Sequence, residues 1–262
     1  MKLSFSALLG ILCLSTSVES SEAFTFVGNN NNIVSSCSSN SKNRKSSALN
    51  MATSGQMSCR PIGIGSAAPK TIVTNVDLEK VVETSDDWIR TRTGIAQRRL
   101  LTYPGQSEDE ETEETLTTLS STAAKNALEM SGTNPEDIDL VICATSSPDD
   151  LFGDATTVAK NLGCTNAFAF DLTAACSGFL FGLVTAGQFM DRKGSGVKNA
   201  LVVGADALSR WVDWDDRNSC ILFGDGAGAM VLQGTADGDG KCGLLGYSAH
   251  SNGGGHDDLM CG

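Results

Sequence analysis

The sequence predicts an α/β fold, because apolar runs of strand length alternate along it with stretches of helical periodicity. The chain has 262 residues, 40% of them hydrophobic and 19% charged, which is typical of one large globular domain or two small ones. Only 6% are aromatic, whereas 28 residues are glycine, which favours close packing of small side chains. We therefore expect helices layered on a central sheet.

The first clear helix is predicted over residues 114–132, "ETLTTLSSTAAKNALEMSG". Its apolar side chains recur at intervals of three or four residues, and Gly132 closes it. These side chains are Leu116, Leu119, Ala123, Ala127 and Met130. The continuous apolar run that follows, "DLVICATSS" at 139–147, predicts a buried strand.

The same alternation continues to the end of the body. "AFAFDL" (167–172) predicts a strand, "CSGFLFGLVTAGQFMDRKG" (176–194) a long helix and "NALVVGADAL" (199–208) another strand. Strand, helix and strand in this order imply a parallel sheet with right-handed crossovers. "CILFGDGAGAMVLQG" (220–234) predicts a further strand, interrupted by glycines.

Charge and cysteine spacing exclude several function classes. The net charge of −12 repels nucleic acid, so DNA or RNA binding is not expected. The nine cysteines form no CxxC pair and no Cys/His cluster with zinc-ligand spacing, which predicts reduced thiols and no metal site. "FGDGAGA" (223–229) fits a permissive GxGxxA pattern, but a strand is predicted where a dinucleotide-binding turn needs a helix, so a nicotinamide cofactor is not expected.

The first 58 residues have the composition of a targeting leader. Residues 1–23 combine Lys2, an apolar stretch too short to cross a bilayer and a small-residue site ending at Ala23, which predicts a signal peptide and no membrane span. Residues 24–58 contain no Asp or Glu but many Ser, Asn, Lys and Arg, as transit peptides do. This order resembles the two-part plastid leader of algae with complex plastids, so we expect localisation in the plastid stroma.

Cys176 is the candidate nucleophile. It follows a predicted strand after a short turn, so it should occupy the first turn of the next helix, where unpaired N–H groups and the helix dipole stabilise a thiolate. The small neighbours Ala174, Ala175, Ser177 and Gly178 leave room for a substrate carbonyl and could offer backbone N–H donors to an oxyanion. A cysteine among alanines and glycines is equally compatible with a small core residue, and spacing alone leaves both interpretations open.

Four ordered motifs resemble β-ketoacyl-acyl-carrier-protein synthase III, a thiolase-like condensing enzyme that begins type II fatty-acid synthesis. They are "ETSDDWIRTRTGI" (83–95), "DLTAACSGF" (171–179), "LVVGADALSR" (201–210) and "FGDGAGAMVL" (223–232). The resemblance implies a layered α-β-α thiolase-like fold. Its N-terminal half, with the nucleophile, is expected in residues 59–235, and the start of its C-terminal half in residues 236–262.

The resemblance also implies a binding site for coenzyme A. Trp88 and Arg92 match positions at which the family contacts CoA, with Thr84 nearby, and Arg217 matches a further CoA-contacting arginine. Trp88 could offer a flat face to adenine, and Arg92 could stack or pair with phosphate. Phe152 lies where the family places an aromatic side chain that lines the acyl pocket near the dimer partner. For Trp88 and Phe152, an ordinary packing role stays open.

The reaction that the resemblance implies is acyl transfer followed by decarboxylative condensation. Cys176 would take an acetyl group from acetyl-CoA as a thioester, and malonyl-acyl-carrier protein would then yield acetoacetyl-acyl-carrier protein, CoA and carbon dioxide, without a metal or redox cofactor. The full-length protein is expected to be a homodimer. Arg90, Arg98 and Arg99 could attract the acidic carrier protein or be ordinary solvated side chains.

The second catalytic step needs residues that the sequence does not supply in their family context. Family members use a histidine in a His-Gln-Ala-Asn type motif and a further asparagine to stabilise an enolate. That motif does not occur here, and the two histidines, His250 and His256, lie in "SAHSNGGGHDD". We therefore expect a truncated sequence. A related thiolase-fold polyketide-type synthase and a non-catalytic binding partner of an intact synthase remain alternatives.

Overall fold

The computed structural model describes residues 59–105, 114–191 and 194–235, together with residues 243, 247–249, 251 and 254. The predicted leader (1–58) lies outside the described residues, as do His250 and His256. None of the helices in the described part of the chain has the length and apolar character that crossing a bilayer requires.

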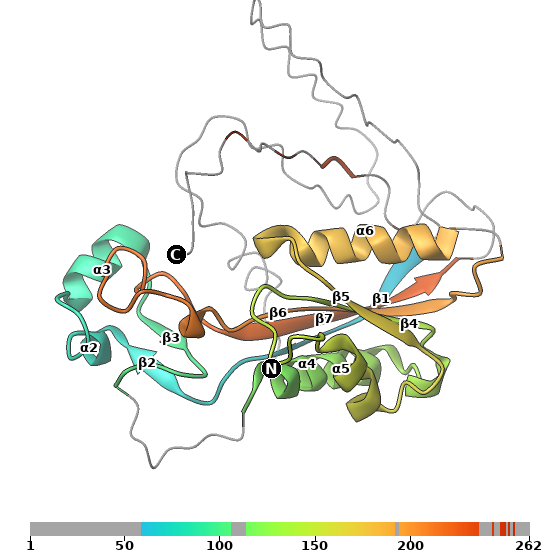
Figure 1. The fold of residues 1–262 in the computed structure, drawn as a ribbon, viewed down its shortest axis with the longest axis horizontal. Helices are drawn as coiled ribbons and strands as arrows, with labels where there is room; N and C mark the ends of the chain where they lie inside the picture. The colour runs from blue at the N-terminus through green and yellow to red at the C-terminus, as the bar shows by residue number, and fades with distance from the viewer. Residues whose placement is uncertain are drawn as a thin grey trace, which may run out of the picture.

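A mixed five-stranded sheet with strand order β1-β7-β6-β4-β5 lies at the centre of the molecule (Figure 1). Its strands are β1 (Cys59–Ala67), β4 (Leu140–Ala144), β5 (Phe168–Leu172), β6 (Asn199–Asp206) and β7 (Gly226–Gly234). Strand β4 pairs in parallel with both β5 and β6, whereas β7 pairs antiparallel with β6 and β1. The predicted parallel arrangement is thus confirmed for three strands, and the antiparallel pairs make the whole sheet mixed.

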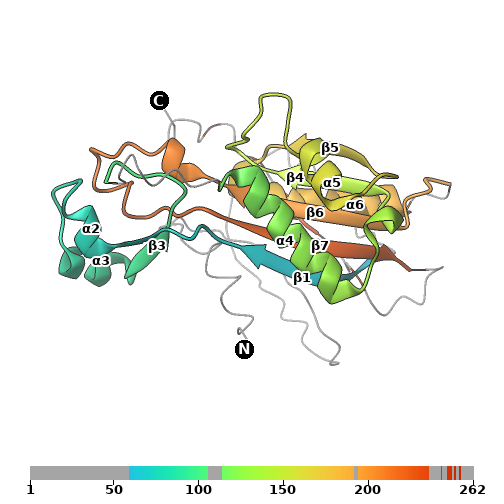
Figure 2. The same ribbon diagram turned by 90° about the horizontal axis from the view of Figure 1, so that it is seen from below.

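Helices cover both faces of this sheet. Helix α6 (Gly178–Asp191) lies on one face, and α4 (Leu116–Ser131) and α5 (Ala155–Leu162) lie on the other (Figure 1). Figure 2 shows α4 running across β7 and β1. Separate buried clusters fill the two interfaces, with Leu183 of α6 in one and Val158 of α5 in the other. The layered α/β fold predicted from the sequence is confirmed.

Helix α4 matches its predicted range closely because both of its ends carry local signals. Thr115 caps the first turn by accepting a hydrogen bond from the Thr118 N–H at 3.2 Å, and Gly132 ends the helix at a φ of 67°. The prediction that Met130 belongs to the buried stripe is wrong, because its side chain is 65% exposed. Its sulfur lies beside the edge strand β1 and accepts the N–H of Ile64 at 3.3 Å.

Helix α4 packs directly against the backbone of β1. A Cβ atom at Gly65 would lie 2.2 Å from the carbonyl oxygen of Ala123, and one at Gly63 would lie 2.3 Å from that of Ala127. No real side chain could occupy either position without moving the helix. The glycines of β1 therefore set the separation between α4 and the sheet.

The strand predicted over 220–234 begins later than expected. Only Gly226–Gly234 forms strand β7, and residues 220–225 turn away from the sheet. The Asp225 carboxylate holds this turn by accepting the N–H groups of Leu101 and Ser209 at 2.7 and 3.0 Å. Residues 220–225 therefore lie outside the sheet.

A smaller unit lies at one end of the sheet (Figure 1). It consists of β2 (Ile72–Thr74), α2 (Asn75–Leu78), α3 (Asp86–Thr93) and β3 (Gln97–Arg99). Its buried cluster also includes side chains from the segment that follows β6. The fully or nearly fully buried members are Val73, Leu78, Ile89, Leu100, Cys220 and Ile221. The small unit is thereby joined to the end of the sheet at which β6 finishes.

Candidate active site

Cys176 lies in the turn that connects β5 to α6. The strand ends at Leu172, a single 3₁₀ turn spans Ala175–Ser177, and α6 begins at Gly178. The structure therefore places Cys176 at the start of a helix, as the sequence suggested, and its side chain is exposed. Among the described cysteines, the other four are buried, namely Cys59, Cys143, Cys164 and Cys220.

The backbone of this turn is strained. Ala175 has a φ of 44°, the one positive φ found at a non-glycine residue in the described ranges. An L-amino acid in this region costs about 1–2 kcal/mol, so the surrounding structure must hold it there. The strained residue directly precedes Cys176 and turns the chain sharply from strand to helix.

Two backbone donors expected for an oxyanion are used within the turn itself. The N–H of Ser177 donates to the Ala174 carbonyl at 3.1 Å, and the N–H of Gly178 donates to the Ala175 carbonyl. A 3₁₀ turn closes such bonds by its geometry. The expectation that these two groups face an oxyanion is therefore wrong for this structure.

Trp88, Arg92 and Arg217 come together in one cluster. Ser85 caps α3 and accepts the Trp88 N–H at 3.2 Å, and Arg92 follows one helical turn later. The Arg92 guanidinium carbon lies 4.3 Å from the centroid of the Trp88 ring. Arg217 reaches the same ring from the segment after β6, at 4.8 Å. Three of the residues matched to CoA contacts are thus neighbours through cation–π contacts.

Thr84 lies beside this cluster. Its hydroxyl oxygen is buried and has no hydrogen-bond partner among the described residues. Arg217 donates to the carbonyl of the preceding residue, Glu83, at 3.2 Å. An unsatisfied buried hydroxyl costs free energy, which a ligand group beside it could recover.

The arginines considered for attraction of a carrier protein have other contacts. Arg98 is only 7% exposed and donates to the Asn75 side chain at 2.9 Å and to the Ile221 carbonyl at 3.1 Å. A surface role for Arg98 is therefore wrong, because its guanidinium joins three segments inside the small unit. Arg90 pairs with Asp86 on α3, and Arg99 donates to the Pro69 carbonyl at 2.7 Å.

Phe152 lies on the loop between β4 and α5. Its side chain is 94% exposed, and that of Leu151 is 93% exposed. The structure thus places Phe152 in solvent and does not bring it into a pocket with the other predicted site residues. Its N–H donates to the Asp150 carboxylate at 2.9 Å, so the tip of the loop has a defined backbone conformation.

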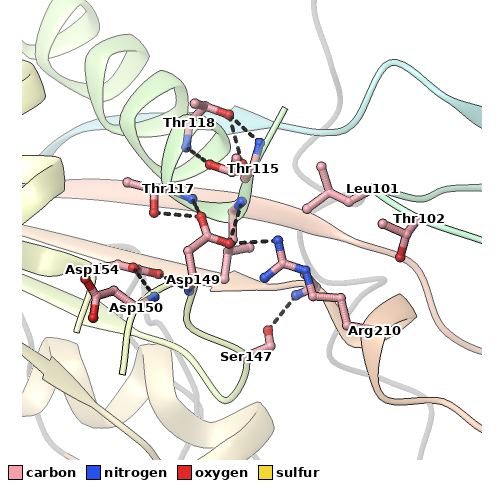
Figure 3. A network of polar contacts seen from close by, with 12 residues as sticks. Leu101, Thr102, Thr115, Thr117, Thr118, Ser147, Asp149, Asp150, Asp154 and Arg210 are labelled. Carbon is pink, nitrogen blue, oxygen red and sulfur yellow. Dashed lines mark hydrogen bonds and ion pairs between the residues drawn. The ribbon is translucent and has the colours of Figure 1, made fainter. Parts of the chain in front are cut away.

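Asp149 anchors the base of this loop (Figure 3). Its carboxylate accepts the N–H and the hydroxyl of Thr117 on α4, both at 2.7 Å, and forms an ion pair with Arg210 at 2.7 Å. Burial acts to raise the pKa of Asp149, but hydrogen bonds from Thr117 and Arg210 outweigh it and hold the pKa at about 2. Sequence reasoning missed this pair, because the two residues are far apart in the chain.

The candidate site follows from the direction of the strands. Strands β4, β5 and β6 are parallel, so their carboxyl ends meet at one edge of the sheet. The Phe152 loop, the Cys176 turn and the segment that carries Arg217 all leave the sheet at this edge, which is where open α/β sheets bind ligands. Within the described ranges, no group of three or more His, Cys, Asp or Glu side chains could hold a metal ion.

The chain is similar in sequence to known proteins. A family model for 3-oxoacyl-[acyl-carrier-protein (ACP)] synthase III matches residues 170–253. The β-ketoacyl-[acyl-carrier-protein] synthase III of Synechococcus sp. (strain WH7803) is 55% identical over 192 residues, which cover 73% of this chain and 52% of the relative. The chain thus spans about half the length of the curated relatives that it matches.

Solved structures show the same relationship. The 3-oxoacyl-[acyl-carrier-protein] synthase III from Aquifex aeolicus VF5 aligns with a TM-score of 0.61 and 46% identity, over 68% of this chain and 55% of that one. The priming β-ketosynthase of the R1128 polyketide pathway aligns with a TM-score of 0.60 and 34% identity, over 69% of this chain and 51% of that one. On sequence and fold together, the chain belongs to the thiolase-like 3-oxoacyl-[acyl-carrier-protein] synthase III family.

Proposed function

We propose that this protein carries out the acyl-transfer step of a β-ketoacyl-acyl-carrier-protein synthase III, with Cys176 as the group that receives acetyl from acetyl-CoA. The observation that carries the proposal is the exposed thiol on the strained turn between β5 and α6. The 55% identity to a relative of that name supports it.

The step exchanges one thioester for another. The Cys176 sulfur, as thiolate, attacks the carbonyl carbon of acetyl-CoA, a new C–S bond forms, and the C–S bond to CoA breaks. The CoA sulfur leaves with the electron pair and takes up the proton that Cys176 released. The attacking sulfur lies just before the N-terminus of α6, a helix of 14 residues, which is the positive end of its dipole.

The cluster around Trp88 is proposed to hold CoA. The Trp88 ring offers an aromatic face for adenine. Arg92 and Arg217 supply planar cations that suit phosphate groups. The unpartnered hydroxyl of Thr84 adds a polar group beside them. The cluster would thereby bind the nucleotide end of the substrate while the thioester reaches the Cys176 turn.

A condensation with malonyl-acyl-carrier protein would follow. The acetyl group would pass from Cys176 to the carbanion that forms when carbon dioxide leaves the malonyl group, which yields acetoacetyl-acyl-carrier protein. The family's enolate-stabilising histidine and asparagine have no counterpart among the described residues. The described residues therefore support the first step directly and the second only through family membership.

The exposed side chains favour a homodimer as the working unit. Strand β5 is an edge of the sheet, and Phe168 on it is 47% exposed within a group of three phenylalanine rings whose centroids are 5.5–6.5 Å apart. At the other end of β5, the loop before α5 presents Leu151 and Phe152. A second copy could pair along β5 and cover these apolar groups, with Phe152 reaching toward the partner's acyl site.

Residues 1–58 are proposed to deliver the protein to the plastid stroma. The proposal depends on their composition, which has no acidic residue from 24 to 58. A fusion of residues 1–58 to a fluorescent protein, expressed in an alga with complex plastids, would test it. Fluorescence in the cytosol or the secretory pathway would contradict the proposal.

Mass spectrometry after incubation with acetyl-CoA tests the acyl transfer. We expect one added acetyl group on the Cys176 peptide of the wild type and none in Cys176→Ser. Cys164→Ser, which changes a buried cysteine, should be acetylated like the wild type. An adduct that survives in Cys176→Ser, or no adduct on a folded wild type, contradicts the proposal.

A polyketide-type priming synthase is the second candidate, favoured by the alignment to the R1128 priming β-ketosynthase. The two candidates differ in the acyl group that they accept. The same experiment with acetyl-CoA and with longer acyl-CoA substrates separates them. Faster modification by a longer chain would favour the polyketide-type candidate.

A further inference from the structure

The strained turn before Cys176 needs an attachment that holds it. Ala175 has a φ of 44°, and Ala174 has a φ of −153° and a ψ of 38°, outside the regular helix and strand regions. Such conformations persist only where surrounding contacts fix them. The contacts on each side of the turn therefore decide where the sulfur lies.

Thr173 supplies the attachment on the strand side. Its hydroxyl donates to the Thr145 carbonyl, just past the end of β4, at 2.8 Å. Thr145 is buried, and its N–H donates to the Leu172 carbonyl at 3.1 Å. Its own hydroxyl accepts the N–H of Ser147 at 3.0 Å. Thr145 is thus a fixed point to which the chain is bonded twice immediately before the strained residues.

Close contacts fix the helix side. A Cβ atom at Gly178 would lie 3.2 Å from the Ala144 Cβ, and one at Gly182 would lie 2.9 Å from a methyl carbon of Val202. Helix α6 therefore rests on β4 and β6 at the shortest separation that glycine allows. It cannot move toward the sheet to relieve strain in the turn, so the strand-side hydrogen bond has to resist that strain.

We propose that Thr173 is a positioning residue for the Cys176 sulfur. Its hydrogen bond to Thr145 holds Ala175 at positive φ, which keeps the thiol outside the sheet and at the N-terminus of α6. Without this bond, Ala174 and Ala175 relax toward negative φ and Cys176 rotates away from its place. The proposal rests on the acyl transfer proposed above, in which Cys176 is the acceptor.

Two substitutions of Thr173 test the positioning proposal. Thr173→Val keeps the branched shape and removes the donor, whereas Thr173→Ser keeps the hydroxyl. The rate constant of Cys176 acetylation at saturating acetyl-CoA should fall by about tenfold to a hundredfold in Thr173→Val, because small displacements of a reacting atom have effects of this order. The acetyl-CoA concentration at half-saturation should stay unchanged, and Thr173→Ser should restore most of the rate.

The readouts separate positioning from a general loss of structure. Urea denaturation of each variant gives the folded fraction, and the acetylation rates are compared per folded molecule. A wild-type rate in Thr173→Val overturns the proposal. A loss that appears only in the half-saturation concentration, or an equal loss in Thr173→Ser, also overturns it.

Alkylation by iodoacetamide keeps the test independent of CoA. If wild-type Cys176 is alkylated but never acetylated, the acyl-transfer proposal fails, and the positioning of the sulfur is then judged by alkylation alone. Positioning predicts that the Cys176 alkylation rate of Thr173→Val departs from the wild type while that of Thr173→Ser matches it. Equal rates in all three proteins overturn it.

Discussion

The guanidinium group of Arg217 lies over the indole ring of Trp88, with 4.8 Å between its Cζ atom and the ring centroid. The two residues belong to different segments, α3 and the chain that follows β6. Arg92 contacts the same ring at 4.3 Å. The contact joins the small unit to the main sheet and assembles a flat, cationic surface from residues that are distant in sequence.

Removing either side of this contact should weaken CoA binding. Trp88→Ala and Arg217→Ala are each expected to raise the Kd for CoA about tenfold, because a cation–π or stacking contact contributes about 1–2 kcal/mol. Arg217→Lys should recover little, since an ammonium group lacks the planar face. Isothermal titration calorimetry measures the Kd for CoA. Arg60→Ala is the control, because Arg60 lies on β1, donates to Gln233 on β7 and is not part of the Trp88 cluster. Unchanged Kd values in both variants would contradict the assignment.

The described cysteines should differ sharply in reactivity. Burial raises the pKa of Cys164 to about 11 and that of Cys143 further, so neither is a thiolate at neutral pH. Iodoacetamide should therefore modify Cys176 in the native protein and leave Cys143 and Cys164 unmodified, whereas in urea all three should react. Peptide mapping by mass spectrometry gives the site-by-site rates. Native modification of Cys143 as fast as Cys176 would show that the core opens.

The Asp149 carboxylate should stabilise the fold in a pH-dependent way. Its folded pKa of about 2 lies below the ordinary 3.8, so its contribution is present above pH 3.8 and is lost as the pH falls toward 2. Asp149→Asn should lower the free energy of unfolding by about 1–2 kcal/mol at neutral pH, and the difference from the wild type should fade over that acidic range. Urea titrations at a series of pH values measure it. A difference that is independent of pH would mean that the charge is not responsible.

Gly65 should be much less tolerant of alanine than Gly228 on the neighbouring strand β7. Gly65→Ala places a Cβ 2.2 Å from the Ala123 carbonyl oxygen, so α4 must shift, and we expect a loss of about 3 kcal/mol in the free energy of unfolding. A Cβ at Gly228 meets nothing within 4 Å, so Gly228→Ala is the matched control and should change stability little. Equal stability of the two variants would contradict the close packing of α4 on β1.

Phe152 should matter for assembly and not for folding. Because its side chain is 94% exposed, Phe152→Ala should change the free energy of unfolding by less than about 0.5 kcal/mol. In the homodimer proposed above, Phe152 would be buried in the interface, where an aromatic contact contributes about 2 kcal/mol, so the Kd for dimerisation should rise about thirtyfold. Analytical ultracentrifugation measures the Kd, and Val76→Ala on α2, which is 55% exposed in the wild type, is the control. An unchanged Kd would remove Phe152 from the interface.

The elements that could be predicted from sequence are those with long periodic or continuous apolar patterns. Helix α4 and strands β4, β5 and β6 have such patterns, and their ranges agree with the structure to within a few residues. Strand β7 begins later than the apolar pattern predicts, because Cys220 and Ile221 belong to the buried cluster of the small unit and not to the sheet. Apolarity shows that a residue is buried but not which cluster buries it.

The candidate site could also be predicted from the sequence only in part. The position of Cys176 at a strand-to-helix turn could be predicted from the neighbouring elements. The strain at Ala175 could not, because alanine carries no signal for positive φ and the proposed support comes from Thr145, a residue distant in sequence. For Arg98, the sequence suggested a surface role, but the side chain is buried. Arg90 and Arg99 in the same stretch of sequence are exposed, whereas Arg98 is buried because it donates to Asn75 and to the Ile221 carbonyl from other segments.

Strand β5 has two roles in five residues. It forms one edge of the sheet, and its last residue, Leu172, precedes Cys176 by four residues. A molecule that binds along this edge therefore contacts β5, the strand that precedes Cys176. If subunits associate along this edge, as proposed above, only Thr173, Ala174 and Ala175 lie between the contacted strand and Cys176, so dimer formation is expected to affect the reactivity of the thiol.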